Sequence, residues 1–423
     1  MPVSGSDKKQ LVLGLLVLSA LINFIDRGNL SVAAPVLGPE FKLTPVQLGV
    51  LFSAFFWTYS LCQIVTGLLA DRYKASVLYG FGFLLWSAAT LATGFAKGFG
   101  TLLAFRLLLG IGESTAFPAY SSLLANLLPE NKRGFANALI DAAGKSGPAL
   151  GTFAGGFVIA AWGWRSLFLI LGVLSLLWLP PWFRYAPQQD KVATADERRD
   201  APRLIEILAK RSAWATFIGL FGFNYGYFFL LSWLPSYLVT ERHFSMRAMG
   251  VLAALPFAAT AVSSTFFGWL SDRLISRGRS INDVRKSFVV SGLLLCALPL
   301  VMSAVVRNSL SIVLLVTAFT CIGLYSSNVW AITQTLAGPN AAGRWTGLQN
   351  AIANLGSLVA PIVTGFIVKQ TGSFFLAFVV ASVCMLISGA MYLFLVGRIA
   401  PIIWNAQALT ETRPGHPLQG CRP

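Results

Sequence analysis

Charged residues are scarce in this chain. Only 11% of its 423 residues are Asp, Glu, Lys or Arg, whereas 56% are hydrophobic and the mean hydropathy is +0.69. A soluble domain carries about 25% charged residues, so this chain lacks the polar surface that would cover a soluble globule. The deficit argues against an ordinary soluble protein and favours a chain that crosses a membrane many times.

Residues suited to catalysis or metal binding are also few. The chain has two histidines, His243 and His416, and five cysteines without a CxxC pair, so neither a zinc site nor a disulfide framework is supported. The "GKS" of residues 144–146 ends like a phosphate-binding loop, but Leu139 stands where that motif requires its first glycine. We therefore expect neither an enzyme nor an ATP-driven pump, and no cofactor or metal ion.

The chain contains instead a series of apolar segments of about 20 residues, the length that crosses a bilayer as a helix. Twelve such spans lie near 11–37, 46–70, 76–96, 100–127, 135–160, 166–185, 213–239, 247–270, 286–306, 309–336, 345–369 and 373–397. The sequence thus predicts an all-α polytopic membrane protein. We expect it to comprise an N-terminal six-helix bundle (1–185), a cytoplasmic linker (186–212), a C-terminal six-helix bundle (213–398) and a cytoplasmic tail (399–423).

The excess of positive charge follows the predicted topology. The net charge is +16, and 22 of the 32 Lys and Arg residues fall on the side of the two termini, against seven on the opposite side and three within spans. Because basic loops stay in the cytoplasm, we expect both termini to be cytoplasmic and the protein to lie in the cell inner (plasma) membrane. The basic excess then predicts no nucleic-acid partner.

The two halves of the chain repeat one another. "GLLADR" at Gly67 recurs as "GWLSDR" at Gly268, and "GF" at Gly156 recurs at Gly365. These matches keep the same order, and their separation drifts only slightly along the chain. They indicate two parallel six-span repeats, as in many transporters.

Several motifs resemble those of a known family. Twelve spans with "GLLADRYK" between spans 2 and 3 resemble the major facilitator superfamily, although Lys74 replaces the second glycine of its loop motif. Within it, "NFIDRGNLSVAAP" and "RLLLGIGESTAFPA" resemble the anion:cation symporter family, which includes galactonate, glucarate, hexuronate and phthalate carriers, sialin and the vesicular glutamate transporters. The resemblance implies the major facilitator fold, a monomer, and transport of small organic anions with protons.

Charged residues inside a span each cost about 2.5–3.5 kcal/mol on insertion scales, so each needs a reason. Six are present: Asp26, Arg27, Arg106, Glu113, Asp141 and Lys145. The repeat places uncharged residues at the equivalent positions of the second half: Gly226, Tyr227, Thr317, Leu324, Asn350 and Asn354. The scaffold is therefore built without these charges in one half, and we assign them to function.

Two acids and one arginine are candidates for proton coupling. Arg106 and Glu113 are seven residues apart and share one helix face about 10 Å apart. Burial disfavours a charged carboxylate, which suits Glu113 to binding a proton; a static Arg106–Glu113 packing pair is the alternative. The resemblance implies that this span-4 pair couples protons, with Asp26 as a second proton site.

The substrate is expected to bind beside these acids. The Arg27 guanidinium offers a planar pair of donors to a carboxylate, unless it only neutralises Asp26. The resemblance implies that Tyr59 hydrogen-bonds the same carboxylate, although an interface tyrosine would look alike. Lys145 is a second cationic candidate, unless its salt bridge with Asp141, four residues earlier, is purely structural. Four amides either read substrate hydroxyls or bridge helices: Asn224, Asn328, Asn350 and Asn354.

The remaining motifs are conformational. The repeated pairs at the inner ends of spans 2 and 8 are expected to latch one state by capping a neighbouring helix: Asp71, Arg72, Asp272 and Arg273. Gly147, Gly151 and Gly155 let helices pack closely and are candidates for the interface that rocks.

Together these features predict a secondary active transporter. We expect proton-coupled uptake of a small organic carboxylate, a sugar acid or an aromatic acid, by alternating access. An organic-anion uniporter or exchanger without proton coupling is the alternative.

Overall fold

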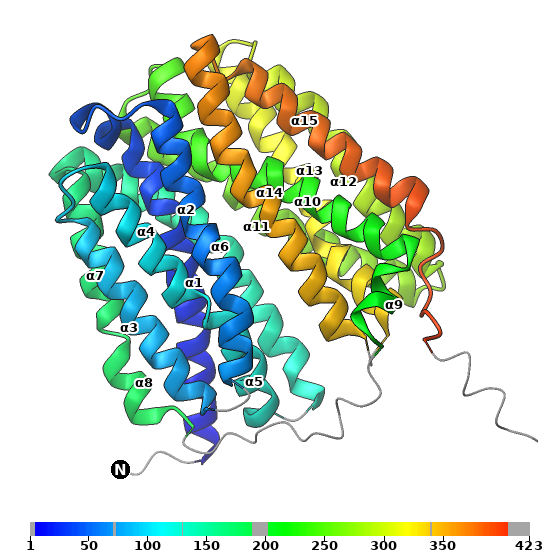
Figure 1. Cartoon of the computed structure of the whole chain (residues 1–423). Helices are drawn as coiled ribbons and strands as arrows, with labels where there is room; N and C mark the ends of the chain where they lie inside the picture. The colour runs from blue at the N-terminus through cyan, green and yellow to red at the C-terminus, as the bar shows by residue number, and fades with distance from the viewer. Residues whose placement is uncertain (1–4, 71–72, 129, 188–201, 339–340, 405–423) are drawn as a thin grey trace, which may run out of the picture.

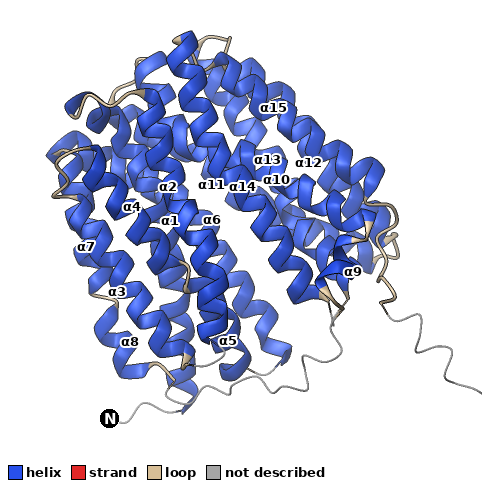
Figure 2. Cartoon of the chain, viewed as in Figure 1, coloured by secondary structure: helices blue, strands red, loops and turns tan. Residues whose placement is uncertain are grey.

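The fold is entirely helical in the part of the chain that the computed structural model describes, namely residues 5–70, 73–128, 130–187, 202–338 and 341–404 (Figure 2). The first half contains α1 (Gly5–Glu40), α2 (Pro45–Ala70), α3 (Ala75–Thr93), α4 (Phe99–Glu113), α5 (Ala116–Leu127), α6 (Glu130–Trp162), α7 (Trp164–Leu176) and α8 (Leu179–Tyr185). The second half contains α9 (Leu204–Leu208), α10 (Arg211–Ser236), η2 (Tyr237–Glu241), α11 (Met246–Ser276), α12 (Ile281–Ser303), α13 (Asn308–Ala337), α14 (Ala342–Thr371), α15 (Phe375–Ala390) and η3 (Met391–Leu395).

The helices match the predicted membrane spans. Eleven segments of the described chain are long and apolar enough to cross a membrane, and four of them join two elements: α4 with α5, α7 with α8, α10 with η2, and α15 with η3. At 33 residues α6 is also long enough, but Asp141, Lys145 and many glycines lower its apolarity. Counting α6 gives twelve spans, so the predicted fold class is confirmed.

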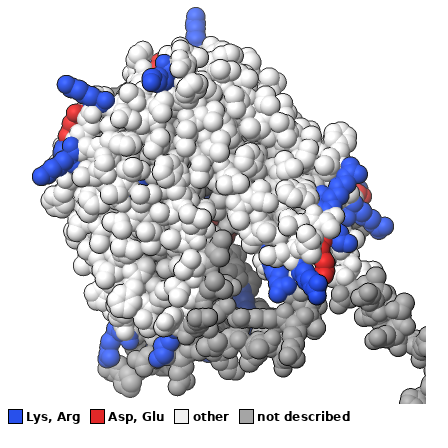
Figure 3. All heavy atoms as spheres, viewed as in Figure 1, with Lys and Arg blue, Asp and Glu red and all other residues white. Residues whose placement is uncertain are grey.

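The spans form two bundles, one from each half of the chain (Figure 1). The bundles contact each other through α2 with α14, α6 with α11 and α1 with α10. Their ribbons converge at the end opposite the N-terminus and diverge toward the end where α9 lies (Figure 1). In Figure 3, the visible charged side chains gather at the two ends, and an almost uncharged surface lies between them. This distribution fits a protein whose waist faces lipid.

Equivalent contacts recur in the two bundles. Thr58 donates to the Leu107 carbonyl at 2.8 Å, and Thr260 donates to the Phe319 carbonyl at 2.8 Å. These threonines connect the second membrane span of each half to the fourth, α2 to α4 and α11 to α13. The repeated contact supports the internal repeat that the sequence indicates.

A second repeated contact closes each bundle at the convergent end. Glu40, at the end of α1, accepts a hydrogen bond from Trp164 Nε1 at 2.6 Å. Glu241, at the end of η2, accepts one from the Phe374 backbone at 2.7 Å. In each half an acid after the first span therefore holds the start of the sixth, which stiffens the bundle.

Glycines allow the bundles to touch at the convergent end. A Cβ on Gly156 of α6 would lie 2.5 Å from the Gly250 Cα of α11. In the pseudo-symmetric crossing of α2 with α14, a Cβ on Gly49 would collide with the Pro361 carbonyl, and one on Gly365 with a carbonyl of α2. Because the atoms in contact belong to the backbone, no rotation of a side chain could relieve such a clash. We call the four residues Gly49, Gly156, Gly250 and Gly365 the glycine crossings.

The predicted glycine stripe of α6 has a different neighbour. Gly147 lies against Phe24 and Gly151 against Ile25, both on α1 of the same bundle. Gly155 faces Val32, also on α1. The stripe therefore packs α6 against α1 within one bundle. The neighbouring Gly156 makes the contact between the bundles.

Candidate functional site

The centre of the site is a buried ion pair between α1 and α4. Arg27 Nε donates to Glu113 Oε2 at 2.8 Å, and the side chains are 7% and 0% exposed. The rings of Phe24, Phe55 and Tyr59 lie 4.7, 5.1 and 4.8 Å from the guanidinium carbon. Arg27 and Glu113 thus each have a partner of opposite charge, and the aromatic faces add favourable cation–π contact with Arg27.

Arg106 does not take the partner that its spacing suggests. It is buried on the same helix as Glu113, but the carboxylate pairs with Arg27. Its Nε has no hydrogen-bond partner within the described residues, and the Phe55 ring lies 5.7 Å from its guanidinium carbon. The static Arg106–Glu113 pair is therefore absent, and Arg106 supplies a second positive charge beside the ion pair.

Arg27 and Arg106 both line a small cavity at the junction of the bundles. Phe56 of α2 and Phe228 of α10 close it from the two sides, with ring centroids 4.8 Å apart. The volume open to the centre of a water molecule is about 10 Å³. That is room for about one water. The cavity beside the two arginines is therefore too small for a sugar acid in this conformation.

Asp26 faces away from this cavity. It is fully buried, its Oδ1 accepts from Asn29 Nδ2 at 3.2 Å, and it lies beside Thr90 of α3. Its Oδ2 has no partner in the described part of the chain. The helical offset of about 100° between neighbours explains why Asp26 and Arg27 point to different surroundings, as the sequence predicts.

Several buried polar atoms around the ion pair have unused hydrogen-bonding capacity. No partner is present among the described residues for Asp26 Oδ2, Arg27 Nη2, Arg106 Nε and Glu113 Oε1. Buried polar groups are usually satisfied, so each exception calls for an explanation. The two arginine donors belong to residues that line the cavity and suit an anion, whereas the two carboxylate acceptors suit protons.

Tyr59 lies beside Arg27, and its predicted hydrogen bond to a substrate carboxylate stays a prediction. It is buried, stacks on Phe55 with centroids 5.1 Å apart, and its hydroxyl accepts from Gln63 Nε2 at 3.4 Å. Sequence reasoning missed the other two rings around Arg27. A usable signal was present, because Phe24 precedes Arg27 by three residues and Phe55 precedes Tyr59 by four, which places each pair on one helix face.

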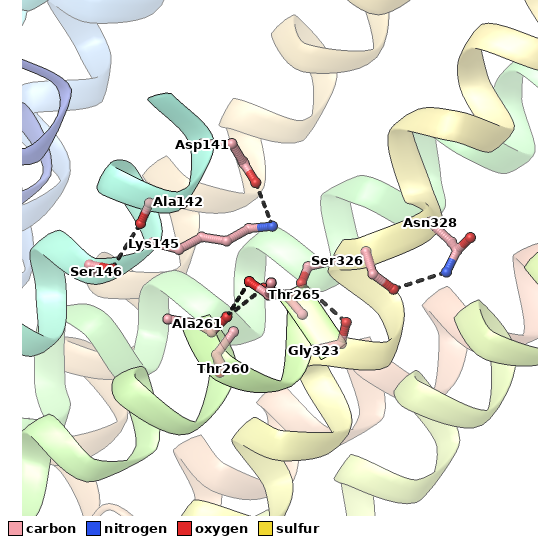
Figure 4. Close-up of polar contacts among 12 residues, drawn as sticks. Asp141, Ala142, Lys145, Ser146, Thr260, Ala261, Thr265, Gly323, Ser326 and Asn328 are labelled. Carbon is pink, nitrogen blue, oxygen red and sulfur yellow. Dashed lines mark hydrogen bonds and ion pairs between the residues drawn. The ribbon is translucent and has the colours of Figure 1, made fainter. Parts of the chain in front are cut away.

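Lys145 forms the salt bridge that its spacing allows. Its Nζ lies 2.7 Å from Asp141 Oδ2, and the two side chains are 25% and 59% exposed. Figure 4 shows Lys145 extending from α6 toward α11 and α13, where Thr265, Ser326 and Asn328 lie. Besides holding Asp141, the lysine thus extends from its own bundle toward the second one.

The four predicted amides have different surroundings. Asn328 accepts from Ser271 Oγ at 2.8 Å and donates to Ser327 Oγ at 2.9 Å, so it bridges helices α11 and α13. Asn354 is buried, and its Nδ2 has no partner in the described part of the chain. Asn224 and Asn350 are half-buried. None of these amides is hydrogen-bonded to Arg27 or Lys145 where the structure describes the chain.

The predicted latch is only partly visible. Asp71 and Arg72 lie outside the described residues. Asp272 and Arg273 are exposed at the end of α11, and the Arg273 guanidinium lies 5.0 Å from the Trp269 ring. This arrangement shows no helix cap made by Asp272, and the latch stays a prediction.

Comparisons with known proteins identify the family. The family model described as Major Facilitator Superfamily matches residues 16–361. A probable sulfoacetate transporter of Cupriavidus necator is 31% identical, over 92% of this chain and 94% of that protein. A probable galactarate/D-glucarate transporter of Escherichia coli (strain K12) is 28% identical, over 93% and 96%.

Solved structures show the same fold. A bacterial homologue of the human lysosomal transporter Spinster, in an inward-facing and occupied conformation, aligns with a TM-score of 0.77 over 90% of this chain and 95% of that one, at 20% identity. The family match and the helical architecture lead to one conclusion. The chain belongs to the major facilitator superfamily and is a multi-pass membrane transporter, not an enzyme.

Proposed function

We propose that the protein is a proton-coupled symporter that takes up a small organic carboxylate across the plasma membrane by alternating access. The observation that carries the proposal is the buried Arg27–Glu113 pair beside a cavity at the junction of the bundles. Arg27 is the best anchor for a carboxylate, and Glu113 occupies it when no anion is bound. An incoming anion and Glu113 therefore compete for the same guanidinium.

This competition links the anion to a proton. When the substrate carboxylate pairs with Arg27, Glu113 loses its buried counter-ion, and a buried unpaired charge is costly. Protonation of Glu113 removes that cost. Asp26, with one buried oxygen free of partners among the described residues, is a second proton site on the same helix as Arg27. Anion and proton then bind and leave together.

The conformation fits the step that releases substrate to the cytoplasm. With both termini cytoplasmic, as the distribution of Lys and Arg predicts, the convergent end faces outward and the divergent end faces inward. The glycine crossings would then seal the outer side. Lys145 and the hydroxyl groups of Thr265 and Ser326 would line the route by which the anion leaves.

The residues opposite Lys145 favour a hydroxylated acid over an aromatic one. Thr265 and Ser326 offer hydroxyl groups to the far end of a substrate whose carboxylate lies at Arg27 (Figure 4). The names of the relatives mention sulfoacetate and galactarate/D-glucarate. Neither kind of acid is aromatic, and the sugar acids carry hydroxyl groups. Both are small acids with a second polar or charged end.

The decisive test is uptake by the purified protein in proteoliposomes with a panel of sugar acids, sulfonated acids and aromatic acids. We expect uptake to be faster when the medium outside the vesicles is more acidic than the lumen. The same gradient should drive accumulation of at least one sugar acid. Each pH unit can drive up to about tenfold accumulation per coupled proton, since one unit corresponds to 1.36 kcal/mol. Equal uptake with and without the gradient would favour a uniporter or exchanger.

Lys145→Gln tests the far end of the site. We expect affinity for a dianion such as galactarate to fall by about tenfold or more, because a charged hydrogen bond is lost, with little change for a monoanion. Asp141→Asn is the matched control, since it breaks the same salt bridge but keeps the lysine. Competition for uptake measures both. If the two variants behave alike, the salt bridge is structural and Lys145 does not bind substrate.

A further inference from the structure

A second hollow lies on the outside of the C-terminal bundle, away from the transport site. It runs between α12 and η3 and has a volume of about 560 Å³. Val290, Leu294 and Leu295 of α12 and Leu393 of η3 form its apolar part. We call it the α12–η3 groove. Leu295 is 59% exposed and Leu294 is 38% exposed, so in a membrane this surface must be covered by lipid or by another protein.

One end of the groove is polar. Asp283, Lys286 and Ser287, from the first two turns of α12, line it there. Lys286 Nζ donates to the Gly397 carbonyl at 3.2 Å, which fixes the ammonium at the mouth of the groove and leaves other N–H donors of the three. Within the described residues, neither Asp283 nor Lys286 takes part in an ion pair. The groove thus presents an acid and a base side by side above an apolar channel.

The length of the groove matches one leaflet of a bilayer. From Asp283 to Leu295 the helix rises by about 18 Å at 1.5 Å per residue. Half of a bilayer's hydrocarbon core is about 15 Å, so the polar end falls at the level of the lipid headgroups when the apolar part lies among acyl chains. The polar end is also the end at which the chain leaves η3, near Gly397.

We propose that the α12–η3 groove binds one phospholipid of the phosphatidylethanolamine type. Its phosphate accepts a hydrogen bond from Lys286, its primary ammonium donates to Asp283, and one acyl chain lies along the apolar part. The paired acid and base favour this headgroup. A choline headgroup has no N–H to give Asp283, and a glycerol headgroup offers the Asp283 carboxylate only neutral hydroxyl groups in place of a charged ammonium.

The test is lipid retention by the full-length protein. The protein is reconstituted with equal amounts of phosphatidylethanolamine, phosphatidylcholine and phosphatidylglycerol of identical chains, extracted in mild detergent and weighed by native mass spectrometry. We expect one retained ethanolamine lipid per chain. Lys286→Ala should lower its retention by about tenfold, since a charge-assisted hydrogen bond is lost. Asp283→Asn should keep lipid but lose the preference for ethanolamine over choline.

Matched controls separate binding from folding. Lys97→Ala removes an exposed lysine at the opposite end of the protein and should retain lipid like the unchanged chain. Leu294→Trp fills the groove and should expel the lipid, whereas Leu298→Trp, at a position 69% exposed on the same helix but outside the groove, should not. Equal retention of all three lipids, a preference for the glycerol lipid, unchanged retention in Lys286→Ala, or a dimer in place of the lipid-bound monomer would overturn the proposal.

Discussion

Glu113→Gln is expected to abolish accumulation driven by a pH gradient while leaving exchange of substrate across the membrane intact. The unchanged protein should concentrate its anion up to about tenfold per pH unit for each coupled proton, and the variant should reach a ratio of one. The reason is that glutamine keeps the size of Glu113 but carries no exchangeable charge. Arg27, which bonds to Glu113 at 2.8 Å, is then permanently available to substrate.

The measurement compares net uptake under a pH gradient with counterflow of labelled substrate at equal pH on both sides. Asp26→Asn is the matched comparison, because Asp26 is equally buried but bonds to Asn29 instead of Arg27. We expect it to impair accumulation with less effect on affinity for the anion. Loss of both exchange and binding in Glu113→Gln would instead mean that the ion pair serves only to hold α1 against α4.

Gly156→Ala is expected to stop the convergent end from closing and thereby to stop transport. The new methyl group would lie 2.5 Å from Gly250 Cα, and backbone on both sides leaves nothing that can rotate away. Overpacking of this kind costs about 1–3 kcal/mol, which shifts the equilibrium between conformations by about 5- to 150-fold. The shift favours the state in which the convergent end is open.

Spin labels at Lys42, in the loop after α1, and at Lys369, in the last turn of α14, report this directly. After both are changed to cysteine in a background without native cysteines, the distance distribution should move to longer values in Gly156→Ala. Gly347→Ala is the control, because a Cβ there meets nothing within 4 Å. Gly147→Ala, which crowds Phe24 within one bundle, should lower stability without lengthening the distance. An unchanged distribution in Gly156→Ala would show that the crossing tolerates a methyl group.

The fold was predictable because membrane spans are local. An apolar run of about 20 residues specifies its own helix in a bilayer, so the spans and the two halves could be found from the sequence. The breaks at Ser114 and Leu177, which divide two spans into α4 with α5 and α7 with α8, could not. At the first break Ser114 bonds to the Ile111 carbonyl and Thr115 to the Gly112 carbonyl, and hydrophobicity alone does not register such bonds.

The candidate site was predictable in its members but not in its pairing. Spacing within one helix correctly placed Asp141 beside Lys145. It also suggested Arg106 for Glu113, whereas the structure gives that carboxylate to Arg27 of α1. Contacts between helices depend on how far each helix rotates and slides against its neighbours, which one sequence does not specify. The same limit explains why the stripe around Gly151 was offered as an interface between bundles although it faces α1.

The convergent end has one further consequence. In the described chain, all three ion pairs lie within the first bundle, and none joins the two bundles. Closure there depends on short-range contact between backbones at the glycine crossings, so no ordered water shell of charged groups is stripped when the bundles meet. The opening and closing of this end should therefore be nearly independent of ionic strength.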